Sequence, residues 1–114
     1  MRKIGLYQVY DNIGNRFITQ VIPCDTSLIA ALGFYNSYIK EKDPQKNPFK
    51  YQALDLVKQA SFDVDEDGKW CNPVETKWEC SGKDIKSFIS SEMAALGIDD
   101  YFEAEDEDVI AEGE

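Results

Sequence analysis

The chain has 114 residues, of which 43% are apolar, and a formal net charge of −10. This length allows one domain with a modest core, and the sequence holds neither an apolar run long enough to cross a membrane nor an apolar leader after Met1. Because histidine is absent, Ser-His-Asp and Cys-His catalysis are excluded, and we expect a protein that is not an enzyme and carries no cofactor. The missing leader and an odd number of cysteines without CxxC spacing lead us to expect a cytoplasmic protein.

The charge is unevenly distributed. All twelve Lys and Arg lie in residues 1–98 beside thirteen Asp and Glu, whereas residues 99–114 hold nine acids and no base. The sequence therefore predicts one near-neutral domain over 1–98 and a disordered acidic tail over 99–114. Apolar residues interrupt the acids of the tail, so two interpretations stay open: a solubilising end, or a motif that covers the domain's own basic surface or recruits a protein partner.

Three cysteines, Cys24, Cys71 and Cys80, occur without CxxC spacing. With no histidine, a Cys/His zinc site is impossible, and a four-cysteine site lacks one ligand. Three reduced thiols are the simplest interpretation, with a Cys71–Cys80 bridge across a hairpin as the alternative.

The first third of the chain predicts a hairpin and a helix. Residues 3–10 and 16–22 are rich in β-branched and aromatic types and flank the turn-forming residues 11–15, and Pro23 is expected to end the second strand. A helix follows from Asp25 or Thr26, either of which can cap its first turn.

Apolar residues occupy two adjacent faces of this helix, more than one sheet is expected to cover. The first face carries Leu28, Leu32, Tyr35 and Ile39, and the second carries Phe34 and Tyr38. We therefore expect a homodimer with Phe34 and Tyr38 at its interface.

The remainder predicts more sheet and a second helix. Residues 51–64 form a strand that can be bulged, and residues 70–79 form one or two short strands. Ser81 and Asp84 match a capping box, and Gly97 is a suitable residue to end the helix. The apolar stripe of this helix is Ile85, Phe88, Ile89, Met93 and Leu96. The predicted fold is α+β: an antiparallel sheet of four or five strands with two helices on one face, in the order ββα-ββ-α.

The turn Asp63-x-Asp65-x-Asp67-Gly68 begins like a calcium loop. The twelfth position, which needs a bidentate acid, is Val74, and Glu75 comes one residue late. A charged hairpin turn without metal is the expected structure.

Lysines and aromatic residues alternate between positions 38 and 51. Lysines neutralise phosphates and aromatic faces stack on unpaired bases, so this segment is the candidate nucleic-acid site. Its residues are Tyr38, Lys40, Lys42, Lys46, Phe49, Lys50 and Tyr51. Because Glu41 and Asp43 dilute the charge, the alternative is a solvated loop whose aromatic residues dock into the core.

Three segments resemble the small nonstructural protein of gokushovirus-type microviruses, phages with circular single-stranded DNA. They are the opening K-x-x-L-Y-x-V-Y-D from Lys3 to Asp11, the K-D-P-x-K-N-P-x-x-Y segment from Lys42 to Tyr51, and the acidic turn from Phe62 to Gly68. The similarity covers residues 3–70. It implies a non-capsid accessory protein that binds single-stranded DNA during genome replication or packaging. The alternative is a dimeric protein-interaction module that binds a viral or host protein without contacting DNA.

Overall fold

The computed structural model describes residues 2–48, 50, 53–75 and 77–98. It is an α+β fold in which a six-stranded antiparallel sheet is combined with two helices, as the sequence predicted for the class. The elements in chain order are β1 (Arg2–Asp11), β2 (Arg16–Phe17), β3 (Ile22–Cys24), α1 (Ser27–Phe34) with its π-helical extension η1 (Tyr35–Ile39), β4 (Leu54–Val64), β5 (Trp70–Val74), β6 (Trp78–Ser81) and α2 (Ile85–Ala95).

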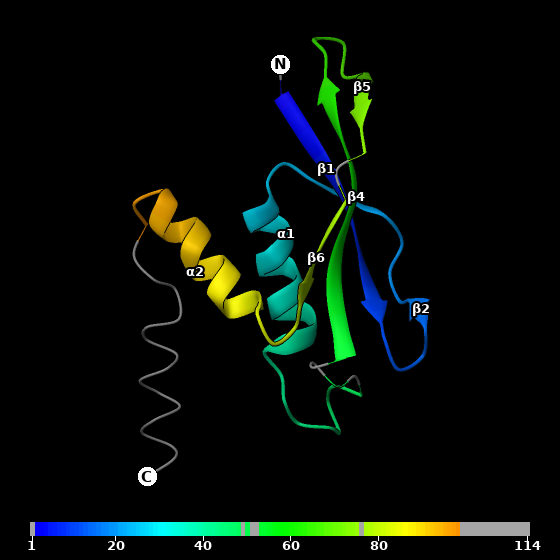
Figure 1. The fold of residues 1–114 in the computed structure, drawn as a ribbon, viewed down its shortest axis with the longest axis vertical. Coiled ribbons are helices and arrows are strands. Elements are labelled where there is room, and N and C mark those ends of the chain that lie inside the picture. The colour runs from blue at the N-terminus through cyan, green and yellow to red at the C-terminus, as the bar shows by residue number, and fades with distance from the viewer. Residues whose placement is uncertain (1, 49, 51–52, 76, 99–114) are drawn as a thin grey trace.

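Two long strands form the centre of the sheet. β1 and β4 pair antiparallel along their whole lengths, from Arg2 opposite Val64 to Asp11 opposite Leu54. On the side away from β4, β1 pairs with both β2 and β3. On the side away from β1, β4 pairs with both β5 and β6. Each edge is thus made of two short strands, which is why six strands form where four or five were expected (Figure 1).

The predicted strand 16–22 is interrupted by a side chain. After Phe17, the hydroxyl of Thr19 accepts the backbone N–H of Val9 at 3.0 Å, in place of a backbone carbonyl. The chain rejoins β1 at Ile22, and Pro23 lies inside β3 opposite Leu6. The expectation that Pro23 ends the strand was wrong, because an edge strand tolerates a residue that has no N–H to donate.

The expected bulge occurs in β4, which begins at Leu54. Its register with β1 shifts between Leu6 and Tyr7, where Gln59 is the extra residue. Leu54 and Leu56 face the helices and are buried.

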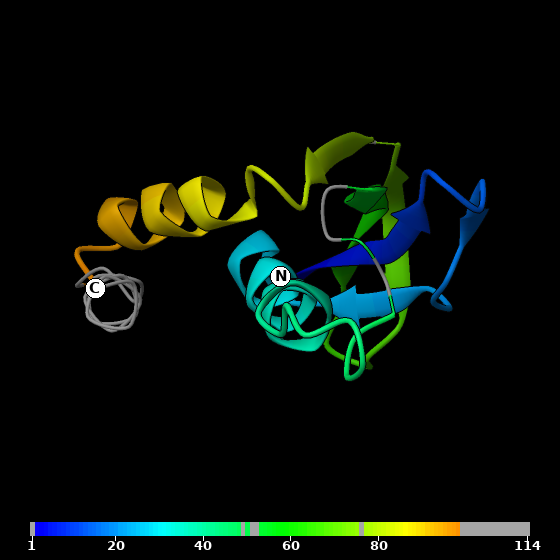
Figure 2. The same cartoon turned by 90° about the horizontal axis from the view of Figure 1, so that it is seen from below.

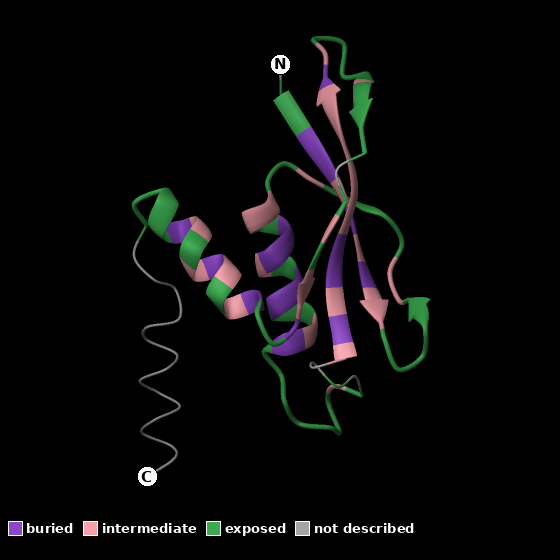
Figure 3. Ribbon diagram, viewed as in Figure 1, coloured by how far each residue is buried: buried purple, intermediate pink, exposed green. Residues whose placement is uncertain are grey.

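Both helices cover the same face of the sheet (Figures 1 and 2). Thr26 caps α1, because its hydroxyl accepts the N–H of Ile29 at 3.1 Å. The buried core lies between the helices and the sheet (Figure 3). It contains Tyr7, Val9, Ala30, Ala31, Phe34, Tyr35, Ile39, Leu54, Leu56, Ile85, Ile89 and Met93.

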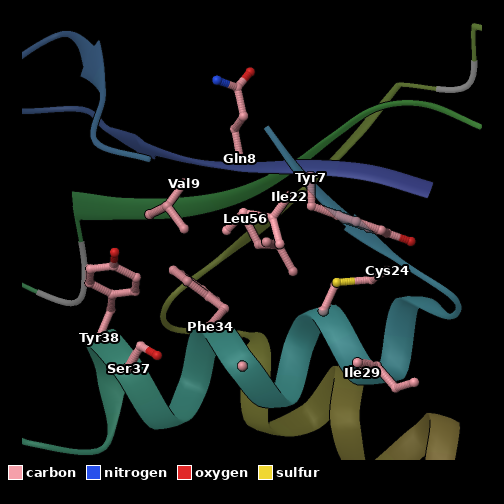
Figure 4. Close-up of a pocket in the computed structure, with 12 residues that line it drawn as sticks. Tyr7, Gln8, Val9, Ile22, Cys24, Ile29, Phe34, Ser37, Tyr38 and Leu56 are labelled. Atoms are coloured by element: carbon pink, nitrogen blue, oxygen red, sulfur yellow. The ribbon is translucent and has the colours of Figure 1, made fainter. Parts of the chain in front are cut away.

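The apolar faces of α1 are covered within one chain, by the sheet and by α2. Phe34 is only 3% exposed and belongs to the core of one chain, and its role at a dimer interface stays a prediction. Phe34 and Tyr38 lie toward the sheet, at the cavity between α1 and β3 (Figure 4). The homodimer itself stays a prediction.

Helix α2 buries Ile85, Ile89 and Met93 as its stripe predicts, but Leu96 is 65% exposed. The helix ends before Leu96, because Gly97 adopts φ +73° and the N–H of Ile98 bonds to the carbonyl of Met93 at 2.9 Å. This is the Schellman closure that a glycine at C′ favours. At the other end, the hydroxyl of Ser81 accepts the N–H of Asp84 at 3.3 Å, so Ser81 closes the turn that leads into the helix.

Among the residues that the structure describes, no helix is long and apolar enough to span a bilayer.

Candidate functional site

The segment that follows η1, residues 40–50, is here called the lysine loop. Lys40, Lys42, Lys46 and Lys50 are all exposed. The acids of the loop are used internally: Glu41 Oε1 accepts the N–H of Asp43 at 3.0 Å, and Asp43 Oδ1 accepts the N–H of Gln45 at 3.0 Å. The carboxylates of Glu41 and Asp43 thus accept hydrogen bonds from the backbone of the same loop, and the four lysines are exposed.

Asn47 fixes the loop to the end of η1. Its side-chain amide donates to the carbonyl of Tyr38 at 2.6 Å and to that of Glu41 at 2.9 Å. The carbonyl of Tyr38 is one that the helix end leaves without an intrahelical partner, and that of Glu41 lies just beyond the helix. The loop thus has a defined shape, which lowers the entropy cost of presenting its lysines to an anion.

The structure does not place the whole predicted site on the loop. Tyr38 is half-buried and packs against Phe34, with ring centroids 6.3 Å apart. Phe49 and Tyr51 lie outside the described residues. Of the predicted nucleic-acid residues, the four exposed lysines lie on one loop, and Tyr38 borders a cavity next to the start of that loop.

That cavity, here called the apolar cleft, has a volume of about 180 Å³ and opens between α1 and β3. Tyr38 lies at one end, Cys24 and Ile29 lie at the other, and Phe34 lies between them (Figure 4). The π-helical turn places both Ser37 and Tyr38 at the cleft. The lining is completed by Tyr7, Gln8, Val9, Ile22, Ala30, Gly33 and Leu56.

The sheet face away from the helices, here called the open sheet face, also carries aromatic residues. Tyr10 and Phe17 are paired across β1 and β2, with ring centroids 5.0 Å apart in an edge-to-face arrangement. Phe62 and Trp70 form a second pair, at 5.6 Å, toward the other end of β4. Neither pair was predicted from the sequence. The period-2 alternation of the first strand places Tyr10 on the sheet face away from the core. Only the strand register shows that Phe17 lies beside it.

The Tyr10–Phe17 pair borders an open depression of about 570 Å³. The polar side chains that line it include Asn12, Gln59 and Lys77, as well as the acids Asp55 and Glu79. Asp55 accepts a hydrogen bond from the Asn12 amide at 2.8 Å. The depression thus combines aromatic rings with side chains that donate hydrogen bonds and side chains that accept them.

The lysine loop and the Tyr10–Phe17 pair lie at the same end of the sheet. Lys50 accepts the N–H of Ala53 through its carbonyl at 2.9 Å, and Ala53 in turn accepts the N–H of Asn12 at 2.8 Å. Asn12 is two residues from Tyr10 in the turn after β1. The loop is therefore connected by backbone hydrogen bonds to the end of the open sheet face.

The thiols of Cys24 and Cys80 are poorly suited to nucleophilic chemistry. Burial raises the pKa of the Cys24 thiol, and the charge of Asp25 adds to the effect. Burial likewise raises the pKa of Cys80, with smaller contributions from Asp84 and Asp55. Because the thiolate is the reactive form, both groups are less reactive than an ordinary cysteine at neutral pH.

The acidic turn after β4 uses its carboxylates as backbone acceptors. Asp65 Oδ1 accepts the N–H groups of Asp67 and Lys69, both at 2.9 Å, and Asp63 Oδ2 accepts from the Asn72 amide at 3.0 Å. Gly68 closes the turn with φ +82°. Within the described part of the chain, no three metal-ligating side chains come together.

Comparison of the chain with protein-family models, with curated proteins and with solved structures finds no match.

Proposed function

We propose that this protein is a non-enzymatic accessory protein that binds single-stranded DNA, in the setting that the resemblance to microvirus nonstructural proteins implies: genome replication or packaging in a phage. One observation carries the proposal. Four exposed lysines lie on a hydrogen-bonded loop at the same end of the sheet as the aromatic pair Tyr10–Phe17.

This arrangement supplies the two interactions that unpaired nucleic acid needs. Lysines neutralise phosphates and release counterions, and aromatic rings on an open sheet face stack with bases. Phe17 is 44% exposed, so its ring is available for stacking. The side-chain carbonyl of Asn12 and the amide of Gln59, which line the depression beside the rings, can hydrogen-bond to base edges without requiring one sequence.

A titration with fluorescent oligo-dT at two salt concentrations tests the proposal, in the full chain and in a chain ending at Ile98. The Lys46→Ala/Lys50→Ala double variant should bind more weakly, and its salt slope should fall by about 1.4, since each contact to a single strand contributes about 0.7. Phe17→Leu should weaken binding without changing the slope, because stacking releases no phosphate counterions.

Lys69 and Trp70 provide matched controls. They lie at the opposite end of β4 from the lysine loop, so Lys69→Ala removes one positive charge and Trp70→Leu removes one aromatic ring away from the proposed site. Equal losses in the control variants would contradict the location of the site. No affinity for oligo-dT at low salt, in either chain length, would contradict DNA binding altogether.

The apolar cleft favours a second candidate function, a dimeric module that binds a viral or host protein. Ile22 and Ile29 at the cleft are 44% and 53% exposed, which is unusual for large aliphatic side chains grouped at a cavity. This candidate is supported if the chain has no affinity for oligo-dT but forms a stable complex with a viral or host protein, and if Ile29→Asp abolishes that complex.

A further inference from the structure

The apolar cleft and the lysine loop are neighbouring parts of one surface. Tyr38 ends the cleft on one side, and the lysine loop begins two residues later at Lys40. The cleft interior is apolar, whereas the loop beside it presents exposed cations. A ligand that matches both must carry an apolar or aromatic group flanked by negative charge.

The chain's own C-terminal segment has this pattern. In residues 99–114, Tyr101 and Phe102 stand between Asp100 and Glu103, and a second apolar pair, Val109–Ile110, follows Asp108. No base occurs in the segment, so every charge on it attracts the lysines. We propose that residues 99–114 of a second copy of this chain dock on this surface, with the Tyr101–Phe102 pair in the cleft and the acids along the lysine loop. This inference does not depend on DNA binding.

The geometry favours a second copy over the chain's own tail. Helix α2, which leads into the tail, lies on one side of α1, and β3, which borders the cleft, lies on the other (Figure 2). Phe102 is four residues beyond Ile98. Four extended residues span about 13 Å, hardly more than the 10–12 Å diameter of a helix, so the pair cannot pass around α1 and still enter the cleft.

Reciprocal docking of two tails gives a closed twofold dimer, because each copy supplies one tail and one cleft. This dimer retains Tyr38 as an interface residue and assigns Phe34 to the floor of the binding cleft. In this dimer the docked tail also covers the exposed side chains of Ile22 and Ile29.

Alkylation of Cys24 measures whether the cleft is occupied, because Cys24 lines it. The full chain is treated with iodoacetamide over a range of protein concentrations, and labelling of the Cys24 peptide is followed by mass spectrometry. Since the rate is proportional to the fraction of open clefts, it should fall several-fold as concentration rises. Tyr101→Ser/Phe102→Ser should remove the fall, while Ala104→Ser, a change in the same tail, should preserve it.

Analytical ultracentrifugation of the same proteins checks the partner. The full chain should form a dimer that dissociates in 1 M salt, where the Debye length is about 3 Å, and the Tyr101→Ser/Phe102→Ser variant should be monomeric. Labelling that is independent of both concentration and the tail substitutions would overturn the proposal. Protection that depends on Tyr101 and Phe102 but not on concentration would overturn the second copy in favour of the chain's own tail.

Discussion

The ring of Tyr7 lies directly over Gly5, its neighbour two residues back on the same face of β1. A Cβ atom at Gly5 would stand 2.7 Å from two atoms of this side chain, closer than real carbon atoms approach. Tyr7 has little room to move away. It is 2% exposed, its hydroxyl shares a 2.9 Å hydrogen bond with that of Ser27, and Trp78 packs against the ring in an edge-to-face contact at 6.0 Å.

Gly5→Ala should therefore destabilise the fold by about 1–3 kcal/mol, the usual cost of overpacking a well-filled core. The free energy of unfolding in urea measures the effect. Gly33→Ala is the matched control: a Cβ there meets nothing within 4 Å, and alanine should stabilise α1 by about 0.5–1 kcal/mol. Equal stability of Gly5→Ala and the parent chain would show that the Tyr7 ring can be displaced without cost.

The cap of α1 gives a second prediction. Because the Thr26 hydroxyl accepts the N–H of Ile29, Thr26→Ala should lower the free energy of unfolding by about 1 kcal/mol. Thr26→Ser keeps the acceptor and should lose much less. If both variants lose the same amount, the methyl group of Thr26, and not its hydrogen bond, is responsible.

Stability should decline at alkaline pH. Burial raises the pKa of Tyr7 above its ordinary value of 10.0 and that of Cys24 above 9.0, so the folded state holds these protons more tightly than the unfolded state. Their contribution is complete below the unfolded pKa values and is lost as pH rises above about 9. Urea unfolding between pH 7 and pH 11 should show this loss.

Tyr7→Phe is the control for the alkaline loss. It removes one titrating group and the hydrogen bond to Ser27, so it should be less stable at pH 7 but lose less stability between pH 9 and pH 11. A parallel decline in both proteins would assign the alkaline loss to other groups.

The acidic turn should bind no calcium in the micromolar range. Asp63 and Asp65 already accept hydrogen bonds from Asn72 and from the turn backbone, and the twelfth position of the loop is Val74. Isothermal titration with calcium should give no saturable heat. Saturable micromolar binding that Asp65→Asn abolishes would contradict this account.

The sequence alone determined what depends on neighbours along the chain. A helix start at Asp25 or Thr26, the turn at Gly68, the closure at Gly97 and the buried stripe Ile85–Ile89–Met93 were all predicted, because capping, positive φ and helical periodicity are local properties. The two-layer α+β class followed from the order of these elements.

Tertiary structure decided what depends on contacts between distant segments. Thr19 replaces a backbone acceptor for Val9, and Pro23 enters an edge strand. The second helix packs against α1 within the same chain. The same holds for the candidate sites. The lysines were visible as a cluster, but the Tyr10–Phe17 pair requires strand register. The apolar cleft requires β3 to lie beside α1, since a cavity belongs to the space between elements and not to any one of them.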